Sequence, residues 1–179
     1  MTSLLQLLNK KYIRIILFLL SFSVSAQNVK NYTLADGLPG NSIKCLFKDS
    51  KGLLWIATET GLCTYNGNEF KIIGSEKGLK YNLIWAITED DKKNIWLSVF
   101  GNGIAKYDGK KFIYFSSKDG LINNSVRTMY FSKEYQCMVF GTEDGLSIFK
   151  GAKFKNFNLK AKNRDNKFQI NFISSYQND

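Results

Sequence analysis

The sequence repeats itself about every 42 residues, and this period limits the fold more than any other feature. Each unit opens on a glycine–leucine pair, continues through an asparagine-containing triplet, and ends on a turn followed by an aromatic strand. The opening pairs are Gly37-Leu38, Gly78-Leu79 and Gly120-Leu121. Matching positions that recur in register indicate a repeat architecture, in which each unit packs mainly against its neighbours.

Within each unit, short apolar runs separated by turn residues predict β-strands. In the first unit these runs cover residues 43–47, 53–58, 62–65 and 70–73. Asn66-Gly67 joins the last two runs and Asp108-Gly109 joins their equivalents, and both dipeptides are strong hairpin signals. Four antiparallel strands in a unit of about 42 residues are typical of a β-propeller blade. We therefore predict an all-β fold, a partial β-propeller whose complete four-stranded blades span about 37–74, 78–116 and 120–159.

The two ends of the chain match incomplete blades. Residues from Val29 to Leu34 match the fourth strand of a unit, which predicts a lone first D strand. Ile170 and Ile173 have the spacing of a first strand, which predicts a lone last A strand and the start of a further blade at 168–176. Because propellers use about 4–8 blades, three cannot close a ring. Residues 27–179 are thus expected to form an incomplete N-terminal propeller, completed by the remaining blades of a longer parent chain.

The repeats resemble a known family. The first unit reads Asp-Gly-Leu-Pro-x-Asn-Ser-Ile and then Asp-Ser-Lys-Gly-x-Leu-Trp-Ile-Ala-Thr, within residues 36–70. This pattern resembles the two-component regulator propeller repeat, and the resemblance extends over residues 29–176. The second unit departs where Lys93 replaces the turn glycine. The third departs further, at Lys133, Gln136 and Val139.

The resemblance implies a place in signalling. Such repeats build the periplasmic sensor region of bacterial sensor kinases, including hybrid two-component proteins tied to polysaccharide use. In that family a β-sandwich, a membrane helix and a cytoplasmic kinase follow the propellers. No catalytic residue can be carried over to this chain, because none of those parts is visible in the sequence.

Residues 1–26 are predicted to be a signal peptide. Basic residues precede an apolar run from Ile15 to Ala26, and Val24-Ser25-Ala26 is a small-residue cleavage site. A spanning helix needs about 20 apolar residues, more than this run contains, so an uncleaved signal anchor is the lesser alternative. We expect a periplasmic or extracellular protein that begins at Gln27 and meets the membrane only through a downstream helix.

Composition excludes several kinds of chemistry. The chain has no histidine, so Ser-His and Cys-His catalysis and histidine metal sites cannot operate in it. Its formal charge is +10, and many of the lysines gather near Phe154 and Phe157. That pattern occurs in nucleic-acid-binding proteins, but export favours a solvated outer strand. No nucleic-acid partner is therefore expected.

The cysteines are odd in number and lie in apolar strands. We interpret Cys45, Cys63 and Cys137 as small buried hydrophobic residues, and a Cys45–Cys63 disulfide is left open.

The acidic and glycine-rich motifs predict turns rather than active sites. Asp-Gly pairs are turn formers, because aspartate bonds its own backbone and glycine accepts positive φ. Asp49 and Asp90 lack the alternating ligands and the bidentate glutamate of a calcium loop. Gly101-Asn102-Gly103 has no helix after it that could bind a phosphate. We expect no metal, no cofactor and no catalytic residue in this segment.

One strand position varies between the units in a way that indicates function. Trp55 and Trp96 recur at one place and are predicted to pack between blades, whereas Trp85 is replaced by a cation in the other units. A polar, variable position in a repeat array usually faces a channel or rim. The candidate ligand-binding residues are this position in each unit and the asparagine just before it: Lys44, Trp85, Arg127, Asn41, Asn82 and Asn124. For the asparagines, backbone capping is the favoured alternative.

The predicted function is a fragment of the ligand-sensing propeller of a two-component sensor, with an oligosaccharide as its ligand. A secreted carbohydrate- or protein-binding propeller without a kinase is the second class. A propeller enzyme such as a glycan lyase is a third, disfavoured by the missing histidine and carboxylate cluster.

Overall fold

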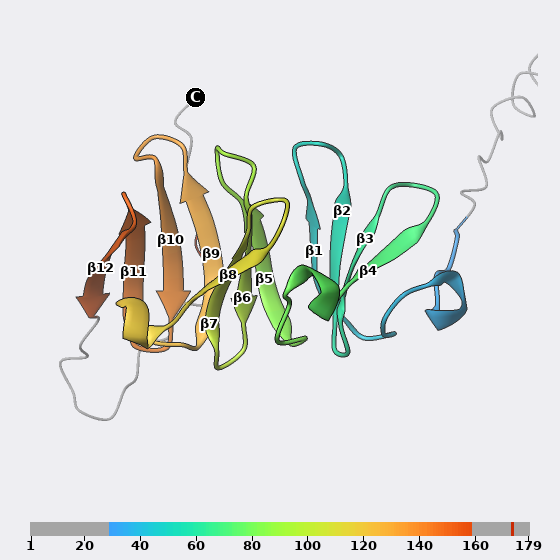
Figure 1. Ribbon diagram of the computed structural model, residues 1–179, viewed down its shortest axis with the longest axis horizontal. Helices are drawn as coiled ribbons and strands as arrows, with labels where there is room; N and C mark the ends of the chain where they lie inside the picture. Colours follow the sequence, from blue (N-terminus) through green and yellow to red (C-terminus); the bar gives the residue numbers. More distant parts are fainter. Residues whose placement is uncertain (1–28, 159–172, 174–179) are drawn as a thin grey trace, which may run out of the picture. The chain divides into compact units, whose positions relative to one another are not determined.

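The computed structural model describes residues 29–158 and Ile173 (Figure 1). The described chain contains twelve strands in three four-stranded antiparallel sheets. The predicted signal peptide lies outside the described residues. So does the predicted last strand, apart from Ile173, which has no regular secondary structure. No helix among the described residues is long and apolar enough to cross a membrane.

Each sheet is formed by four strands that follow one another in the chain. The first sheet contains β1 (Ile43–Lys48), β2 (Leu54–Thr58), β3 (Leu62–Tyr65) and β4 (Phe70–Ile73). The second contains β5 (Ile84–Glu89), β6 (Ile95–Val99), β7 (Gly103–Tyr107) and β8 (Phe112–Phe115). The third contains β9 (Val126–Ser132), β10 (Cys137–Thr142), β11 (Gly145–Lys150) and β12 (Lys153–Asn158). These sheets confirm the predicted all-β fold with three complete four-stranded blades.

The turn between the first two strands of a blade is built on one buried aspartate. Asp49 Oδ1 accepts hydrogen bonds from the backbone N–H groups of Lys51 and Leu53, both at 2.9 Å. Asp49 Oδ2 accepts from Trp55 Nε1 at 3.0 Å. Asp90 does the same for the second blade and accepts from Trp96 Nε1 at 2.9 Å. Each aspartate therefore joins the turn to the core tryptophan.

The connections between blades contain short 3-10 helices. They are Leu34–Asp36, Ser75–Lys77 and Ser117–Asp119, each followed by a glycine with positive φ. The Asp36 and Asp119 carboxylates close capping boxes with Thr33 and Ser116. Hydrogen bonds from the Ser116 backbone and hydroxyl lower the pKa of Asp119. These Asp-Gly pairs thus act as backbone caps.

The hydrophobic core lies between neighbouring sheets. Trp55, Ala57, Leu62 and Ile73 of the first sheet pack against apolar residues of the second sheet. Trp96 packs in the same way against the third sheet, where its ring lies 5.8 Å from that of Phe140. Both tryptophans are almost fully buried, at 4% and 2% exposure. They pack between blades, as the repeat pattern predicts.

The predicted lone strand from Val29 to Leu34 is not a strand. Residues 29–33 have no regular secondary structure, and Leu34 begins a 3-10 helix. None of the three sheets of the described chain includes these residues. Tyr32 nevertheless packs like its equivalent in the repeat, Phe115. The ring of Tyr32 contacts those of Tyr65 and Phe70, with centroids 5.4 and 5.2 Å away. The equivalent Phe115 contacts the equivalent rings of the third sheet.

All three cysteines are free thiols, so the Cys45–Cys63 bridge is not formed. Cys63 and Cys137 are buried, whereas Cys45 is half-buried. Burial raises the pKa of the Cys63 thiol to about 11. It therefore stays protonated and behaves as a small hydrophobic residue.

Candidate functional site

The variable strand position is a β-bulge in every blade. In the first sheet the pairing passes from Ile43 to Cys45, so Lys44 has no partner residue. In the second sheet the pairing skips Trp85, and in the third it skips Arg127. A bulge turns the side chain of the extra residue away from the regular pleat, and bulges occur often beside functional sites. The three positions chosen from sequence variation thus share one backbone irregularity.

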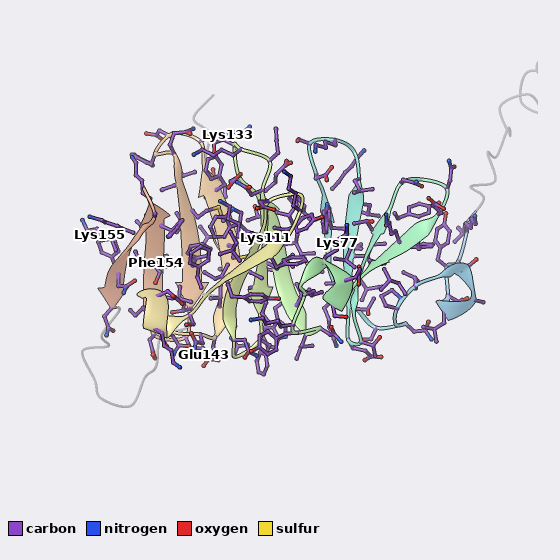
Figure 2. All side chains as sticks on the ribbon, in the orientation of Figure 1. Lys77, Lys111, Lys133, Glu143, Phe154 and Lys155 are labelled. Atoms are coloured by element: carbon purple, nitrogen blue, oxygen red, sulfur yellow. The ribbon has the colours of Figure 1, made fainter. Side chains whose placement is uncertain are left out.

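The structure brings Trp85 and Arg127 together across two blades. The Arg127 guanidinium carbon lies 4.6 Å from the centroid of the Trp85 ring. Phe100, which follows β6, stacks on the same indole with centroids 4.8 Å apart and planes 21° from parallel. Arg127 also forms an ion pair with Glu143, a residue of the β10–β11 connection. Glu143 is labelled in Figure 2. The result is a cluster of one ring pair and one ion pair.

This cluster retains one unsatisfied polar group. Arg127 Nε is buried and has no hydrogen-bond partner among the described residues. An arginine N–H donor without a partner is costly to leave buried, so it favours an acceptor from outside the chain. The Trp85 ring, by contrast, already contacts Phe100 and Arg127. The cluster therefore offers a hydrogen-bond donor more readily than a free ring surface.

The other predicted site residues are placed differently. Lys44 is exposed, and no hydrogen bond, ion pair or ring contact joins it to Trp85 or Arg127 within the described chain. Asn41 and Asn82 are exposed before β1 and β5. Asn124 has a backbone role: its side-chain oxygen accepts from Ser117 N at 2.7 Å. The structure thus joins only part of the predicted set.

Asn124 also lines a small cavity of about 280 Å³ at the same end of the blades. Tyr81 and Tyr114 line it too, with ring centroids 5.9 Å apart. The Tyr114 hydroxyl accepts from Lys80 N and donates to the carbonyl oxygen of Gly78, at 2.7 and 3.0 Å. This cavity combines aromatic walls with amide and lysine groups.

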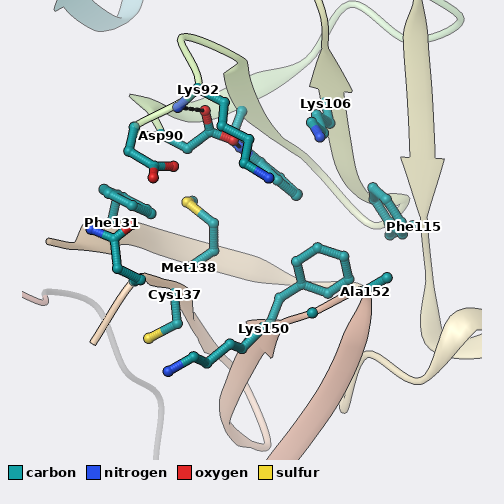
Figure 3. A pocket seen from close by; sticks show the side chains of 14 residues that line it. Asp90, Lys92, Lys106, Phe115, Phe131, Cys137, Met138, Lys150 and Ala152 are labelled. Atoms are coloured by element: carbon teal, nitrogen blue, oxygen red, sulfur yellow. Dashed lines mark hydrogen bonds between the residues drawn. The ribbon is translucent and has the colours of Figure 1, made fainter. Parts of the chain in front are cut away.

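A second cavity, of about 580 Å³, lies between the second and third sheets at the other end of the blades (Figure 3). Lys92, Lys106 and Lys150 line it, together with an aromatic floor that includes Trp96, Phe131 and Phe149. We did not predict it from the sequence. The available signal was the replacement of Glu89 and Asp108 by Phe131 and Lys150 in the third unit.

No cluster of three or more cysteine, aspartate or glutamate side chains that could hold a metal ion occurs in the part of the chain that the structure describes.

Comparison with known proteins confirms the resemblance at the first repeat. Residues 37–60 match the family model of the two component regulator propeller. This segment runs from the glycine that ends the first 3-10 helix to the β2–β3 connection, so it includes the aspartate turn and Trp55. No curated protein matches the chain.

The chain is similar to solved structures of extracellular domains of two component systems. The extracellular domain described for the hybrid two component system BT3049 of B. thetaiotaomicron shares 22% identity, with a TM-score of 0.47 over 78% of this chain and 25% of that one. For the BT4673 domain of the same organism the identity is 18%, the TM-score 0.48 and the coverage 75% and 24%. The present chain thus spans about a quarter of the length of those domains.

Proposed function

We propose that this chain is part of the extracellular ligand-sensing region of a two-component sensor, and that its ligand is a glycan fragment. The observation that carries the proposal is the match of residues 37–60 to the two component regulator propeller model. In this proposal the propeller binds ligand and catalyses nothing itself, and residues 1–26 direct it to the periplasm. A kinase elsewhere in the parent protein supplies the output.

The bulge residues support a binding role. Residues shared by all blades build the core, so a position that carries Lys44, Trp85 and Arg127 in turn is not needed for packing. Cationic and amide side chains beside a ring suit the hydroxyl groups and apolar faces of sugars. We assign the partly exposed Arg127 guanidinium to the ligand as its donor group.

A contact between blades offers a route for signalling. Trp85 belongs to the second sheet and Arg127 to the third, so a ligand that binds Arg127 acts on the contact that joins them. A ligand shifts an equilibrium only by its difference in affinity for the two states. We propose that bound glycan favours one arrangement of these blades, and that this arrangement is passed to the membrane helix of the parent sensor.

The binding part is tested by calorimetric titration of the whole protein with hexasaccharides of starch, xylan and mannan. We expect one of them to bind, and Trp85→Ala and Arg127→Gln each to weaken that affinity about tenfold. Lys51→Ala, at the opposite end of the first blade, is the matched control and retains the affinity. Absence of binding by all three sugars, or variants that bind like the parent, would contradict the proposal.

The sensor part is tested by sequencing the gene beyond codon 179. Further repeats followed by a membrane helix and a kinase support it. A reading frame that continues without a membrane helix favours the alternative, a secreted carbohydrate- or protein-binding propeller.

A further inference from the structure

The two interfaces between blades differ at one end. At the first interface, Glu89 at the end of β5 reaches the turn of the preceding blade. Its carboxylate accepts from Ser50 N and from Ser50 Oγ, both at 2.9 Å. At the second interface the equivalent residues are Phe131 and Asp91, which cannot form this pair of hydrogen bonds. The second interface has the cavity of about 580 Å³ at this place.

The charge of this cavity also differs from that of the first interface. Lys106 is the equivalent of Thr64 in the first blade, since each of the two residues pairs with the core tryptophan of its own sheet. A lysine therefore replaces a threonine at this position. Lys150 replaces Asp108, whose pKa is lowered by backbone hydrogen bonds from Lys111 and Lys110. A neutral and an anionic position have thus both become cationic, whereas Asp91 replaces the neutral Ser50. Lys92, the equivalent of Lys51, supplies a third ammonium group.

These lysines are not neutralised by carboxylates that line the same cavity. Two carboxylates line the cavity. Asp90 is already engaged, because it accepts hydrogen bonds from Trp96 Nε1 and from the Asn94 side chain, and Asp91 forms no ion pair in the described chain. No ion pair joins Lys92, Lys106 or Lys150 to an acidic group in the described chain. Lys106 Nζ instead lies over the Trp96 ring, 5.4 Å from its centroid. An anionic ligand would therefore find ammonium groups available for charge-assisted hydrogen bonds.

The floor of the cavity is aromatic and rigid. Phe149 lies 5.6 Å from Trp96 and 5.2 Å from Phe115, measured between ring centroids. Trp96 stacks on Phe115 with planes 21° from parallel. Figure 3 shows Phe115 and Phe131 on two sides of the cavity, with Lys92 and Lys106 on the side opposite Lys150. A ring-shaped ligand fits such a floor, and the volume is in the range of small-molecule sites.

We propose that this cavity is a second binding site, for a small ring-shaped ligand that carries a carboxylate or sulfate. The ring packs on the floor of Trp96 and Phe149, and the anionic group binds Lys106 and Lys150. The site is independent of the glycan site proposed above, since it lies at the opposite end of the blades and shares no residue with it. Acidic sugars and aromatic carboxylates both have this chemistry.

The test uses three probes on the whole protein: digalacturonate, 4-hydroxybenzoate and the neutral sugar galactobiose. Binding is measured by calorimetry and by the change in tryptophan fluorescence. We expect at least one anionic probe to bind, with an affinity that falls as salt rises, and galactobiose not to bind. Binding of digalacturonate identifies an acidic sugar as the ligand class, whereas binding of 4-hydroxybenzoate identifies an aromatic acid.

The first blade supplies the residues for the variants. Lys106→Thr with Lys150→Asp restores the charge of the first interface and should weaken the affinity at least about tenfold. Asp91→Ser with Phe131→Glu places the equivalents of Ser50 and Glu89 at the second interface, and should weaken the affinity for an anionic probe because the new carboxylate repels it. Lys71→Thr, at an exposed position of β4, is the control for general loss of positive charge and should leave the affinity for the anionic probes unchanged.

Two results would overturn the proposal: neither anionic probe binds at millimolar concentration, or the Lys106→Thr, Lys150→Asp protein binds them like the parent. The lysine variant keeps the test decisive if the Asp91→Ser, Phe131→Glu variant fails to fold, because Lys150 is exposed at the end of β11. Trp85→Ala should leave this binding intact. A failure of the glycan proposal is therefore distinguishable from a failure of this one.

Discussion

At the scale of single residues, one hydrogen bond explains why aspartate and tryptophan occur together in two blades and are both missing from the third. Asp49 and Asp90 each accept from the indole N–H of a buried tryptophan. In the third blade Val139 replaces the tryptophan and Ser132 replaces the aspartate. A buried carboxylate without this donor would be costly, so both residues change together.

Asp49→Ala is expected to destabilise the protein by about 2–3 kcal/mol, because it removes a charged acceptor from two backbone N–H groups and the Trp55 indole. The free energy of unfolding is measured by urea denaturation. Asp91→Ala, at an exposed turn position, is the control and should stay within about 0.5 kcal/mol. Equal losses in the two variants would show that the buried hydrogen bonds contribute nothing particular.

The Cys63 thiol predicts a pH dependence. Its pKa is about 11 in the folded protein because of burial, whereas an exposed thiol titrates near about 8.5. The folded state therefore holds the proton more tightly. Between these values the unfolded state loses protons first, so stability is full below the lower value and falls as pH rises towards the upper one. We expect the stability difference between the parent and Cys63→Ala to shrink over this window in chemical denaturation, and a constant difference would contradict the assignment.

At the scale of elements, the closest approach of two backbones sets the path of the β6–β7 connection. Gly103 begins β7 with a φ of 84°. A Cβ at this residue would lie 2.2 Å from the carbonyl oxygen of Phe115, the last residue of β8. No side chain fits there, so the glycine allows β8 to pair with β7 up to its last residue, Phe115.

Gly103→Ala is therefore expected to cost about 3 kcal/mol or more, because both the clash and the positive φ oppose it. Gly109→Ala separates these two causes. Its φ is 93°, and a Cβ there would meet nothing within 4 Å, so only the backbone strain of about 1–2 kcal/mol remains. Thermal unfolding of both variants measures the difference. If Gly109→Ala is as damaging as Gly103→Ala, the steric argument is wrong.

At the scale of the whole molecule, the first blade exposes an apolar face on β1. The equivalent face of the second blade is covered by the sheet before it. Ile43 and Leu46 of β1 are 42% and 58% exposed. The equivalent Ile84 and Ile87 of β5 are 0% and 7% exposed, because the first sheet packs on them. An exposed apolar strand face of this kind favours association with another surface.

We expect residues 27–179, prepared without further blades, to self-associate through β1, and Leu46→Lys to reduce that association without lowering the thermal unfolding midpoint. Sedimentation velocity over a range of protein concentrations measures the effect. Tyr135→Lys is the matched control, since Tyr135 is also exposed, at 63%, but lies in the β9–β10 turn. Association that persists in Leu46→Lys would place the contact elsewhere.

Local features of the sequence determined the strands and turns. Dipeptides such as Asn66-Gly67 fold through their own backbone preferences, and apolar runs such as Leu62–Tyr65 form strands because both neighbours lie close in the chain. The variable position was visible for a related reason: in a repeat array, residues that do not recur are free of the core. The match of residues 37–60 to the family model follows from the same local pattern.

Contacts between distant residues were decided only by the tertiary structure. The sequence pattern around Tyr32 predicts a strand, but this segment joins none of the sheets of the described chain, and Tyr32 contacts Tyr65 through its ring and its hydroxyl. Lys44, Trp85 and Arg127 occupy equivalent bulges, yet only two of them meet, because contact depends on side-chain reach across an interface. The lysine-lined cavity arises where Phe131 replaces a residue of the Glu89 type, and its charge comes from lysines of two different blades. Local propensity sets the elements, whereas packing between blades sets the sites.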